Sequence, residues 1–109
     1  MVESSIGICE ADERHALIIG ISPGLPTVRE DVRAVEAFTA RNRFNSVTVL
    51  RDNQATTDAV VGFFTEQGTR CYQHGKRNNS NKKYLLMVFY AGHGNHAYGT
   101  QHVSLHDND

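Results

Sequence analysis

The most restrictive feature of this sequence is a run of seven consecutive apolar or aromatic residues, Tyr84–Tyr90, followed by Ala-Gly-His-Gly at positions 91–94. The run does not alternate with polar residues, so it predicts a strand that is buried on both faces, as in parallel sheets. Gly92 and Gly94 allow positive φ angles, so a tight loop is expected after the strand. His93 would therefore lie at the carboxyl edge of a sheet, where α/β proteins place their chemistry.

Two further segments have the pattern of short strands. Residues Ala16–Ile21 form a continuous run that is rich in β-branched residues, and Ser46–Leu50 form a second such run. The first is followed by a loop of turn residues, and the second by a polar segment. The sequence therefore predicts three strands, separated by two connections long enough to hold helices.

Both connections have helical patterns. In the first, Thr27 and Glu30 have the spacing of a capping box, and the helix is expected to end near Asn42. Its apolar residues recur along one face: Val28, Val32, Val35 and Phe38. In the second, Thr56 is the expected cap. The expected core face of that helix is Val60, Val61, Phe63 and Phe64, and residues 73–83 are expected to form a polar, basic loop.

The order strand-helix-strand-helix-strand predicts a parallel sheet with right-handed crossovers. Two strand orders fit, 2-1-3 and 3-2-1. If the first strand is central, the loops after Ile21 and Tyr90 meet in one crevice, and His93 lines it. His93 is then a candidate catalytic base, and the alternative is a loop histidine that bonds to backbone.

Composition limits the class of protein. A length of 109 residues suits one domain, and the net charge of −1 with a pI near 6.6 gives no field that would attract nucleic acid. Residues 1–14 are acidic where a signal peptide would be basic, and no apolar run reaches the length of a membrane span. Two cysteines, Cys9 and Cys71, form no disulfide framework. We expect a cytoplasmic protein that binds neither nucleic acid nor membrane.

The ordered set of these motifs resembles the caspase and metacaspase domain, in particular that of fungal caspase-domain proteins. The resemblance rests on Ala16–Ile21, on Val49-Leu50-Arg51-Asp52 followed by Ala55-Thr56, and above all on Val88-Phe-Tyr-Ala-Gly-His-Gly94, and Val103–Asp107 fits the segment that follows. It covers about residues 15–109 and leaves 1–14 as an extension. It implies an α/β three-layer sandwich whose mostly parallel sheet has the order 2-1-3, with flanking helices and one incomplete edge.

The resemblance also implies an activity. In that family a histidine at the position of His93 pairs with a cysteine to cleave peptide bonds, and the N–H of Gly94 would help to bind the oxyanion. The cysteine follows a later strand in a motif like Asp-x-Cys-x-Gly, and none of the 109 residues matches it. We therefore expect the large-subunit segment of a cysteine endopeptidase, inactive alone, whose cysteine comes from a second polypeptide segment. The alternative is an inactive homologue that acts as a regulatory or interaction module.

Two residues are candidates for the specificity pocket. Asp31 resembles the acidic position with which metacaspases hold a basic P1 side chain, although it is equally explained as a favourable charge near a helix N-terminus. Arg29 would instead favour an acidic P1 side chain if it faced the crevice. The sequence leaves both possibilities open.

Neither cysteine of the chain is expected to be the nucleophile. Cys71 follows about 15 residues of a helix that begins at the edge of His93, so it would lie roughly 22 Å away. Cys9 precedes the first strand and so belongs to the opposite edge. We expect both thiols to be inert.

Other ligands have weaker support, and no cofactor is expected. The residues His93, His96, His102 and His106 are poorly spaced for zinc, because 100–105 is expected to be extended. Asp107 and Asp109 supply too few oxygen atoms for calcium. The basic residues of 76–83 lack an aromatic platform for nucleic acid. A receiver module is disfavoured because acidic residues are missing from the ends of the first and third strands.

The incomplete edge has its own consequence. With the first strand central, Tyr84–Tyr90 would lack a neighbour on one side, and open apolar edges tend to pair. We therefore expect the chain to associate with itself through this strand, or to dock on a polypeptide that carries the rest of the sheet.

Overall fold

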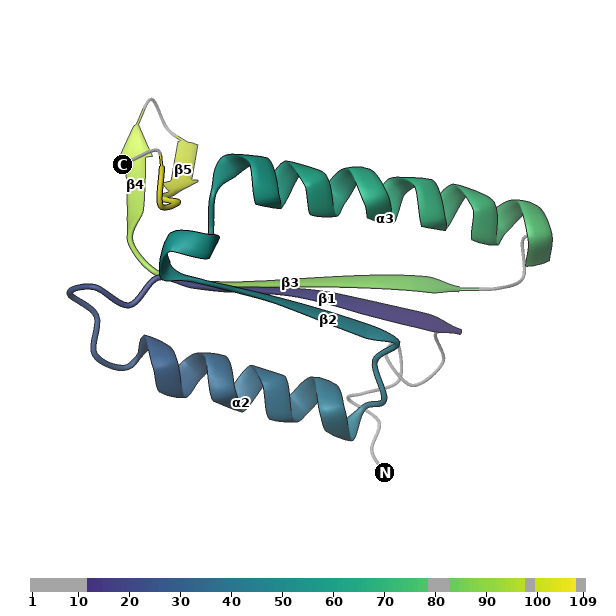
Figure 1. Cartoon of the computed structure of the whole chain (residues 1–109), viewed down its shortest axis with the longest axis horizontal. Helices are drawn as coiled ribbons and strands as arrows, with labels where there is room; N and C mark the ends of the chain where they lie inside the picture. The colour runs from purple at the N-terminus through teal and green to yellow at the C-terminus, as the bar shows by residue number, and fades with distance from the viewer. Residues whose placement is uncertain (1–11, 79–82, 98–99, 108–109) are drawn as a thin grey trace.

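The structure is a computed structural model, and it describes residues 12–78, 83–97 and 100–107. Three parallel strands form its central sheet: β1 (Glu13–Gly20), β2 (Ser46–Arg51) and β3 (Tyr84–Ala91). Their order is β2-β1-β3. Helix α2 (Val28–Arg41) lies on one face of this sheet and α3 (Thr57–Asn78) on the other (Figure 1). The predicted three-layer α/β fold with strand order 2-1-3 is therefore confirmed.

The central strand β1 begins three residues earlier than its apolar run. Glu13 pairs with Tyr84, and the register continues without a break to Gly20 opposite Ala91. The polar start of β1 is explained by His15, whose ring is 2% exposed and has hydrogen-bond partners at both nitrogens. A buried polar side chain with such partners can occupy a strand, but a search for apolar residues does not detect it.

The core has two halves, one on each face of the sheet. Successive residues of a strand point to opposite faces, so Leu17 and Ile19 pack beneath α3 with Phe63, while Ile18 packs against α2 with Val28 and Val32. This explains why the apolar run of β1 is continuous. Complete burial of a Leu or Ile side chain contributes about 1.5–3 kcal/mol, so β1 anchors both layers.

Helix α2 ends at Arg41 with Asn42 as its C-cap, so the predicted end near Asn42 is confirmed, but the helix does not begin with a capping box. Thr27 occupies the N-cap position with φ −90° and ψ −4°, and its side chain makes no capping hydrogen bond. Backbone turns take over this role, because Val28 N–H donates to the carbonyl of Leu25 at 3.3 Å. The predicted capping pair was therefore wrong, although the position of the helix was right.

Helix α3 is capped as predicted, since the Thr56 hydroxyl accepts from the N–H of Ala59 at 3.2 Å. It continues to Asn78, well into the segment that the sequence assigned to a loop. Of its predicted core face, Phe63 is buried and Val60 packs against the core, but Val61 and Phe64 are 56% and 43% exposed. The buried face continues through two polar residues, Gln67 and His74. Among the helices of the described residues, none is long and apolar enough to cross a membrane.

Strand β3 was predicted to be buried on both faces, and this was wrong. Most of its side chains are half-buried, and Val88 is 47% exposed. Within the described residues β3 pairs with β1 alone, so it forms one edge of the sheet. The incomplete edge that the sequence predicted is therefore present.

A small antiparallel hairpin follows β3. It consists of β4 (Gly94–Ala97) and β5 (Thr100–Val103), so the extended conformation predicted for the second of these segments is confirmed. The chain then returns to α3, where His106 N–H donates to the Ala55 carbonyl at 2.9 Å. The Asp107 carboxylate accepts from the N–H and the hydroxyl of Thr57, each at 3.0 Å. In Figure 1 the hairpin accordingly lies beside the first turn of α3.

Candidate functional site at the carboxyl edge of the sheet

Two loops meet where β1 and β3 end. Gly20 and Ala91 are register partners, and Ile21 N–H extends the ladder by donating to the Ala91 carbonyl at 2.9 Å. The loop after β1 leads to α2, whereas β2 lies on the other side of β1. This edge is thus the switch point of the sheet, the usual position of binding sites in open α/β folds.

His93 lies at this edge with its side chain exposed. Its Nε2 atom lies 3.3 Å from the carbonyl oxygen of Pro23, in the loop after β1. A carbonyl only accepts, so this bond requires the proton on Nε2 and leaves Nδ1 as an acceptor in the neutral ring. Within the described residues this carbonyl is the only hydrogen-bond partner of the ring. His93 therefore bonds to backbone, as one interpretation predicted, and keeps one nitrogen open for proton transfer.

Gly24 permits the backbone conformation of the Pro23 loop. Its φ of +79° is a conformation that side chains disfavour. A Cβ atom at this position would lie 3.6 Å from Nε2 of His93, which is an ordinary contact, so the φ angle rather than a lack of space explains the glycine. The contact between the two loops therefore depends on a glycine that the sequence indicated only as a turn residue.

The Tyr90 hydroxyl fixes the backbone around His93. Its oxygen lies 2.6 Å from the carbonyl oxygen of His93 and 2.6 Å from that of Ser104, and it accepts from the Ser104 N–H at 3.2 Å. One hydroxyl proton can serve only one carbonyl at a time, so the two share it. Burial raises the pKa of Tyr90, and the bond to Ser104 partly opposes that rise. The hydroxyl therefore stays a donor at neutral pH.

Gly92 is needed for space. The sequence suggested a positive φ angle, but among the described residues Gly24 is the only glycine with one. A Cβ atom on Gly92 would instead lie 2.6 Å from the Tyr90 hydroxyl, far inside contact distance. The close approach that glycines permit, rather than a special backbone angle, explains this residue.

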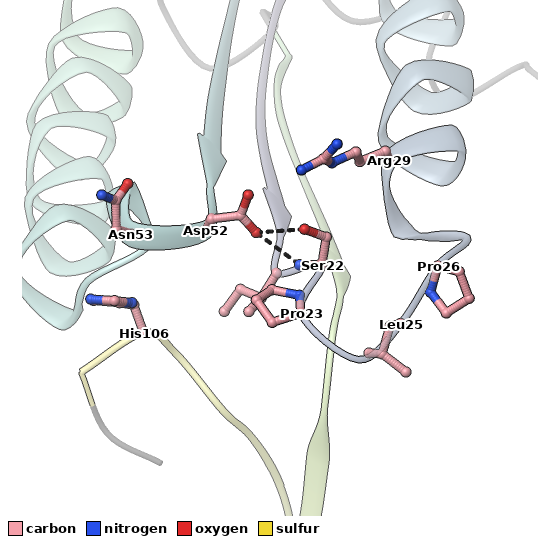
Figure 2. A pocket seen from close by; sticks show the side chains of 9 residues that line it. Ser22, Pro23, Leu25, Pro26, Arg29, Asp52, Asn53 and His106 are labelled. Carbon is pink, nitrogen blue, oxygen red and sulfur yellow. Dashed lines mark hydrogen bonds between the residues drawn. The ribbon is translucent and has the colours of Figure 1, made fainter.

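A pocket of about 750 Å³ opens beside these loops. Residues after β1, at the start of α2, after β2 and near the end of the described chain line it, as Figure 2 shows. The lining residues are Ile21, Ser22, Pro23, Leu25, Pro26, Arg29, Asp52, Asn53 and His106. His93 is not among them, but its partner Pro23 forms part of the wall.

Asp52 joins the loops after β1 and β2. One carboxylate oxygen, Oδ1, accepts from the N–H of Ser22 at 2.8 Å and from its hydroxyl at 2.9 Å, the dashed lines of Figure 2. The Ser22 N–H, then its hydroxyl, and then the charges of Arg29 and Arg51 lower the pKa of this carboxyl. Asp52 is therefore ionised at neutral pH. It has a φ of 52° and begins the short helix η2 (Asp52–Gln54).

The predicted site residues are only partly brought together. Arg29 lines the pocket, and in Figure 2 its guanidinium group extends from α2 toward Ser22 and Asp52. Asp31 is exposed and is not one of the lining residues, because two positions along a helix correspond to a rotation of about 200°. Gly94 is exposed at the first position of β4.

The cysteine and metal predictions concern other regions. Cys71 is exposed on α3, 14 residues after its first residue Thr57, or about 21 Å along the helix from this edge. Cys9 and Asp109 lie outside the described residues. In the part of the chain that the structure describes, no group of three or more His, Cys, Asp or Glu side chains is arranged to hold a metal ion.

Sequence reasoning did not predict a role at this edge for Tyr90, which bonds to the hairpin backbone, or for Asp52 and His106, which line the pocket. Asp52 was noticed only as part of a family motif, and its signal was an acidic residue directly after a strand. Tyr90 was counted as an apolar strand residue.

No protein-family model, curated protein or solved structure matches this chain. A function is therefore inferred from the geometry of this edge and from the sequence motifs.

Proposed function

We propose that the chain supplies the histidine half of a caspase-like cysteine endopeptidase site, as the large-subunit segment of such a domain. One observation carries this proposal: the exposed His93 ring at the switch point of the sheet, held through Nε2 by the Pro23 carbonyl. A general base needs a fixed tautomer and a lone pair that faces its substrate. The bond to Pro23 supports the first condition, and the exposure of the ring at this edge leaves Nδ1 accessible for the second.

In the proposed reaction, a cysteine from a segment outside these residues lies within hydrogen-bond reach of Nδ1. The imidazole accepts the thiol proton, and the thiolate attacks the carbonyl carbon of the scissile bond. The imidazolium then returns this proton to the leaving amine as the C–N bond breaks, which leaves a thioester between the cysteine and the acyl part of the substrate. The neutral imidazole next accepts a proton from a water that attacks this thioester, and returns it to the departing thiolate, so that the acid is released and the cysteine and histidine are regenerated. During the charged stage the Pro23 carbonyl accepts from Nε2–H and stabilises the cation. The N–H of Gly94 and that of the cysteine would bind the oxyanion.

The open edge of β3 suggests where the cysteine would come from. A further parallel strand beside β3 would end at the same edge as His93 and would deliver a residue there. Both the continuation of the same polypeptide and a separate segment would satisfy this geometry.

Of the two possible specificity residues, the positions favour Arg29. It lines the pocket beside the His93 loop, whereas Asp31 does not. A guanidinium group offers a paired donor geometry that fits a carboxylate. We therefore propose that the complete site accepts an acidic P1 side chain, and that Arg29→Glu would reverse this preference.

The test is a peptidase assay on the chain together with the segment that completes it. Denaturing mass spectrometry first establishes whether a cysteine-bearing segment is attached or co-purifies. Fluorogenic peptides with Asp or Arg at P1 are then compared. We expect cleavage of the Asp peptide, at least 100-fold slower with His93→Ala, since general-base removal costs roughly 10²–10⁴-fold.

The matched control is Cys71→Ser, which removes an exposed thiol far from the edge and should leave cleavage unchanged. Full activity of His93→Ala would refute the proposed base. Loss of activity in Cys71→Ser with His93→Ala unaffected would point to a different site. Cleavage of only the Arg peptide would keep the peptidase but overturn the role of Arg29.

The alternative function, that of an inactive homologue acting as an interaction module, is supported by different observations. Val88 lies on the α3 side of β3, in step with Leu86 and Tyr90, and is 47% exposed. Val61, Phe64 and Tyr72 are exposed along one flank of α3. A right-handed crossover from β2 through α3 to β3 turns this flank toward the open edge. An apolar surface beside an unpaired strand suits a protein partner, whether or not peptides are cleaved.

A further inference from the structure

A second, smaller pocket lies between α2 and the end of β2. It has a volume of about 250 Å³ and is separate in position from the His93 loop, although it adjoins the first pocket. Three arginines dominate its lining. The complete set is Gly20, Ser22, Val28, Arg29, Val32, Arg33, Arg51 and Asp52.

The three guanidinium groups come from two elements. Arg29 and Arg33 are four residues apart, so they lie one turn apart on the same face of α2. Arg51 is the last residue of β2, and its Nη2 atom lies 2.9 Å from Oε1 of Glu36. Among the described residues, the side chains of Arg29 and Arg33 form no hydrogen bond or ion pair. Two cationic groups are therefore available for a ligand.

One negative charge faces them. Asp52 is the only acidic residue in the lining, so the lining carries three positive groups and one negative group. The carboxylate is held by Ser22 through Oδ1 rather than by an arginine. The pocket keeps an excess of positive charge, which Glu36 at Arg51 reduces but does not cancel.

The floor of the pocket is apolar and rigid. Val28 and Val32 are buried against β1, and a Cβ atom on Gly20 would collide with the side chain of Val32. Helix α2 therefore packs directly on strand β1 at this point. This packing fixes the backbone positions of Arg29 and Arg33 relative to Arg51. Such a site is preorganised in its backbone, so a ligand has to order only the side chains.

We propose that this pocket binds a small phosphate-bearing anion, with a pyrophosphate group as the best fit. Three guanidinium groups offer more donors than one carboxylate with two oxygens can use, whereas phosphate groups present three or more acceptors each. The volume corresponds to the liquid volume of about eight waters, so it admits more than one phosphate group. A confined pocket in a chain of net charge −1 does not fit a nucleic-acid backbone.

Binding would also affect the neighbouring pocket. Arg29 lines both pockets, so an anion that engages it in the smaller pocket removes a positive group from the larger one. If the larger pocket binds an acidic peptide side chain, the anion inhibits by competition for Arg29. This consequence rests on the proposed function, whereas binding itself does not.

The test is isothermal titration calorimetry of the purified chain with pyrophosphate at constant ionic strength, and with inorganic phosphate and a phosphoserine peptide as comparison ligands. We expect pyrophosphate to bind most tightly. Arg33→Ala should weaken it about tenfold or more, the usual effect of losing one charge-assisted hydrogen bond. The matched control is Arg41→Ala, an exposed arginine at the opposite end of the same helix.

A charge variant with the opposite sign makes the test sharper. Asp52→Asn removes the opposing charge, keeps an oxygen that can accept from Ser22, and suits a positive φ angle. It should bind pyrophosphate more tightly than the wild type does, by about threefold or more, since like charges nearby are repulsive.

Three outcomes would overturn the proposal. If calorimetry at two temperatures and equilibrium dialysis both detect no binding of pyrophosphate, no such site exists. Equal weakening by Arg41→Ala and Arg33→Ala would show diffuse attraction to surface charge instead of a pocket. Tighter binding of the phosphoserine peptide than of pyrophosphate would replace a small molecule with a phosphorylated protein as the ligand. Circular dichroism of each variant confirms that its fold is intact.

Discussion

At the scale of single residues, the Tyr90 hydroxyl connects the two ends of the β4–β5 hairpin through hydrogen bonds. It serves the carbonyls of His93 and Ser104, which lie 2.6 Å from it on either side of the hairpin. Tyr90→Phe keeps the ring but removes this donor, so that the His93 carbonyl keeps only the Ser104 N–H, at 3.0 Å, and the Ser104 carbonyl loses its bond to the hydroxyl. We therefore expect a loss of about 1–2 kcal/mol in the free energy of unfolding. Urea denaturation measures it.

Tyr72→Phe is the matched control, because this tyrosine is 67% exposed on α3. It should change stability by less than about 0.5 kcal/mol, as is usual for surface positions. Equal stability of the two variants would mean that the hydroxyl of Tyr90 is replaced by water without cost. In that case the backbone of His93 would not depend on Tyr90.

Asp52 gives the protein a defined response to acid. Its folded-state pKa is lowered, first by the Ser22 N–H, so the folded state binds a proton less readily than the unfolded chain does. The stabilisation is complete above the unfolded-state carboxyl pKa of about 4, and it is lost as the pH falls through the lower, folded-state value. Asp52→Asn removes this contribution.

The measurement is the free energy of unfolding of wild type and Asp52→Asn at a series of pH values from about 6 down to about 2, across the carboxyl range. The wild type should lose its advantage over the variant only in the lower part of this range. A difference between the two that does not change with pH would contradict the assignment, because an uncharged or unshifted group has no such dependence.

Only part of the candidate site was predicted from the sequence, because the other contacts join residues that are far apart in the chain. The sequence identified His93 and left Arg29 and Asp31 as alternatives. Only the register of α2 against the sheet separates the latter two, which are two residues apart. Asp52 meets Ser22 over a separation of 30 residues, and Tyr90 meets Ser104 over 14. Neither pairing leaves a local pattern in the sequence.

At the scale of elements, α3 differs most from expectation because polar residues complete its buried face. Gln67 is 5% exposed and its side-chain oxygen accepts from the Tyr84 hydroxyl. His74 is also buried, and its ring lies edge-on to that of Tyr84. The apolar pattern correctly placed Val60 and Phe63 on this face but also placed Val61 and Phe64 there, and these two are exposed. Residues 73–78, the last part of the helix, were predicted to be loop because they belong to a polar, basic segment.

Gln67 therefore carries a stability prediction that an apolar pattern would not give. Gln67→Ala leaves the Tyr84 hydroxyl without its acceptor and creates a small cavity, so we expect a loss of about 2–3 kcal/mol. Gln73→Ala, at an exposed position of the same helix, should change stability by less than about 0.5 kcal/mol. Chemical denaturation of both variants measures the change in the free energy of unfolding. If Gln67→Ala does not change it, Gln67 does not belong to the buried face of α3.

At the scale of the whole molecule, the order of strands and helices along the chain was predicted correctly from the sequence. Alternating strands and helices leave few arrangements, and the runs Ala16–Ile21, Ser46–Leu50 and Tyr84–Tyr90 located all three strands of the parallel sheet. The strand order could not be fixed by pattern, because 2-1-3 and 3-2-1 bury the same residues in the first helix. The return of Asp107 to Thr57 was likewise unpredictable, because it joins residues 50 positions apart.

The open edge of β3 determines how the whole molecule should behave in solution. Val88 is 47% exposed beside the apolar flank of α3, while Val47 on the opposite edge strand β2 is 39% exposed. We expect the isolated chain to associate through β3, because an unpaired strand with adjoining apolar surface binds other strands. Val88→Lys should yield a monomer, since a charge on an edge strand opposes such pairing, and Val47→Lys should leave association unchanged. Light scattering over a range of concentrations distinguishes these outcomes. A wild type that stays monomeric, or an equal effect of the two lysines, would show that the β3 edge does not drive assembly.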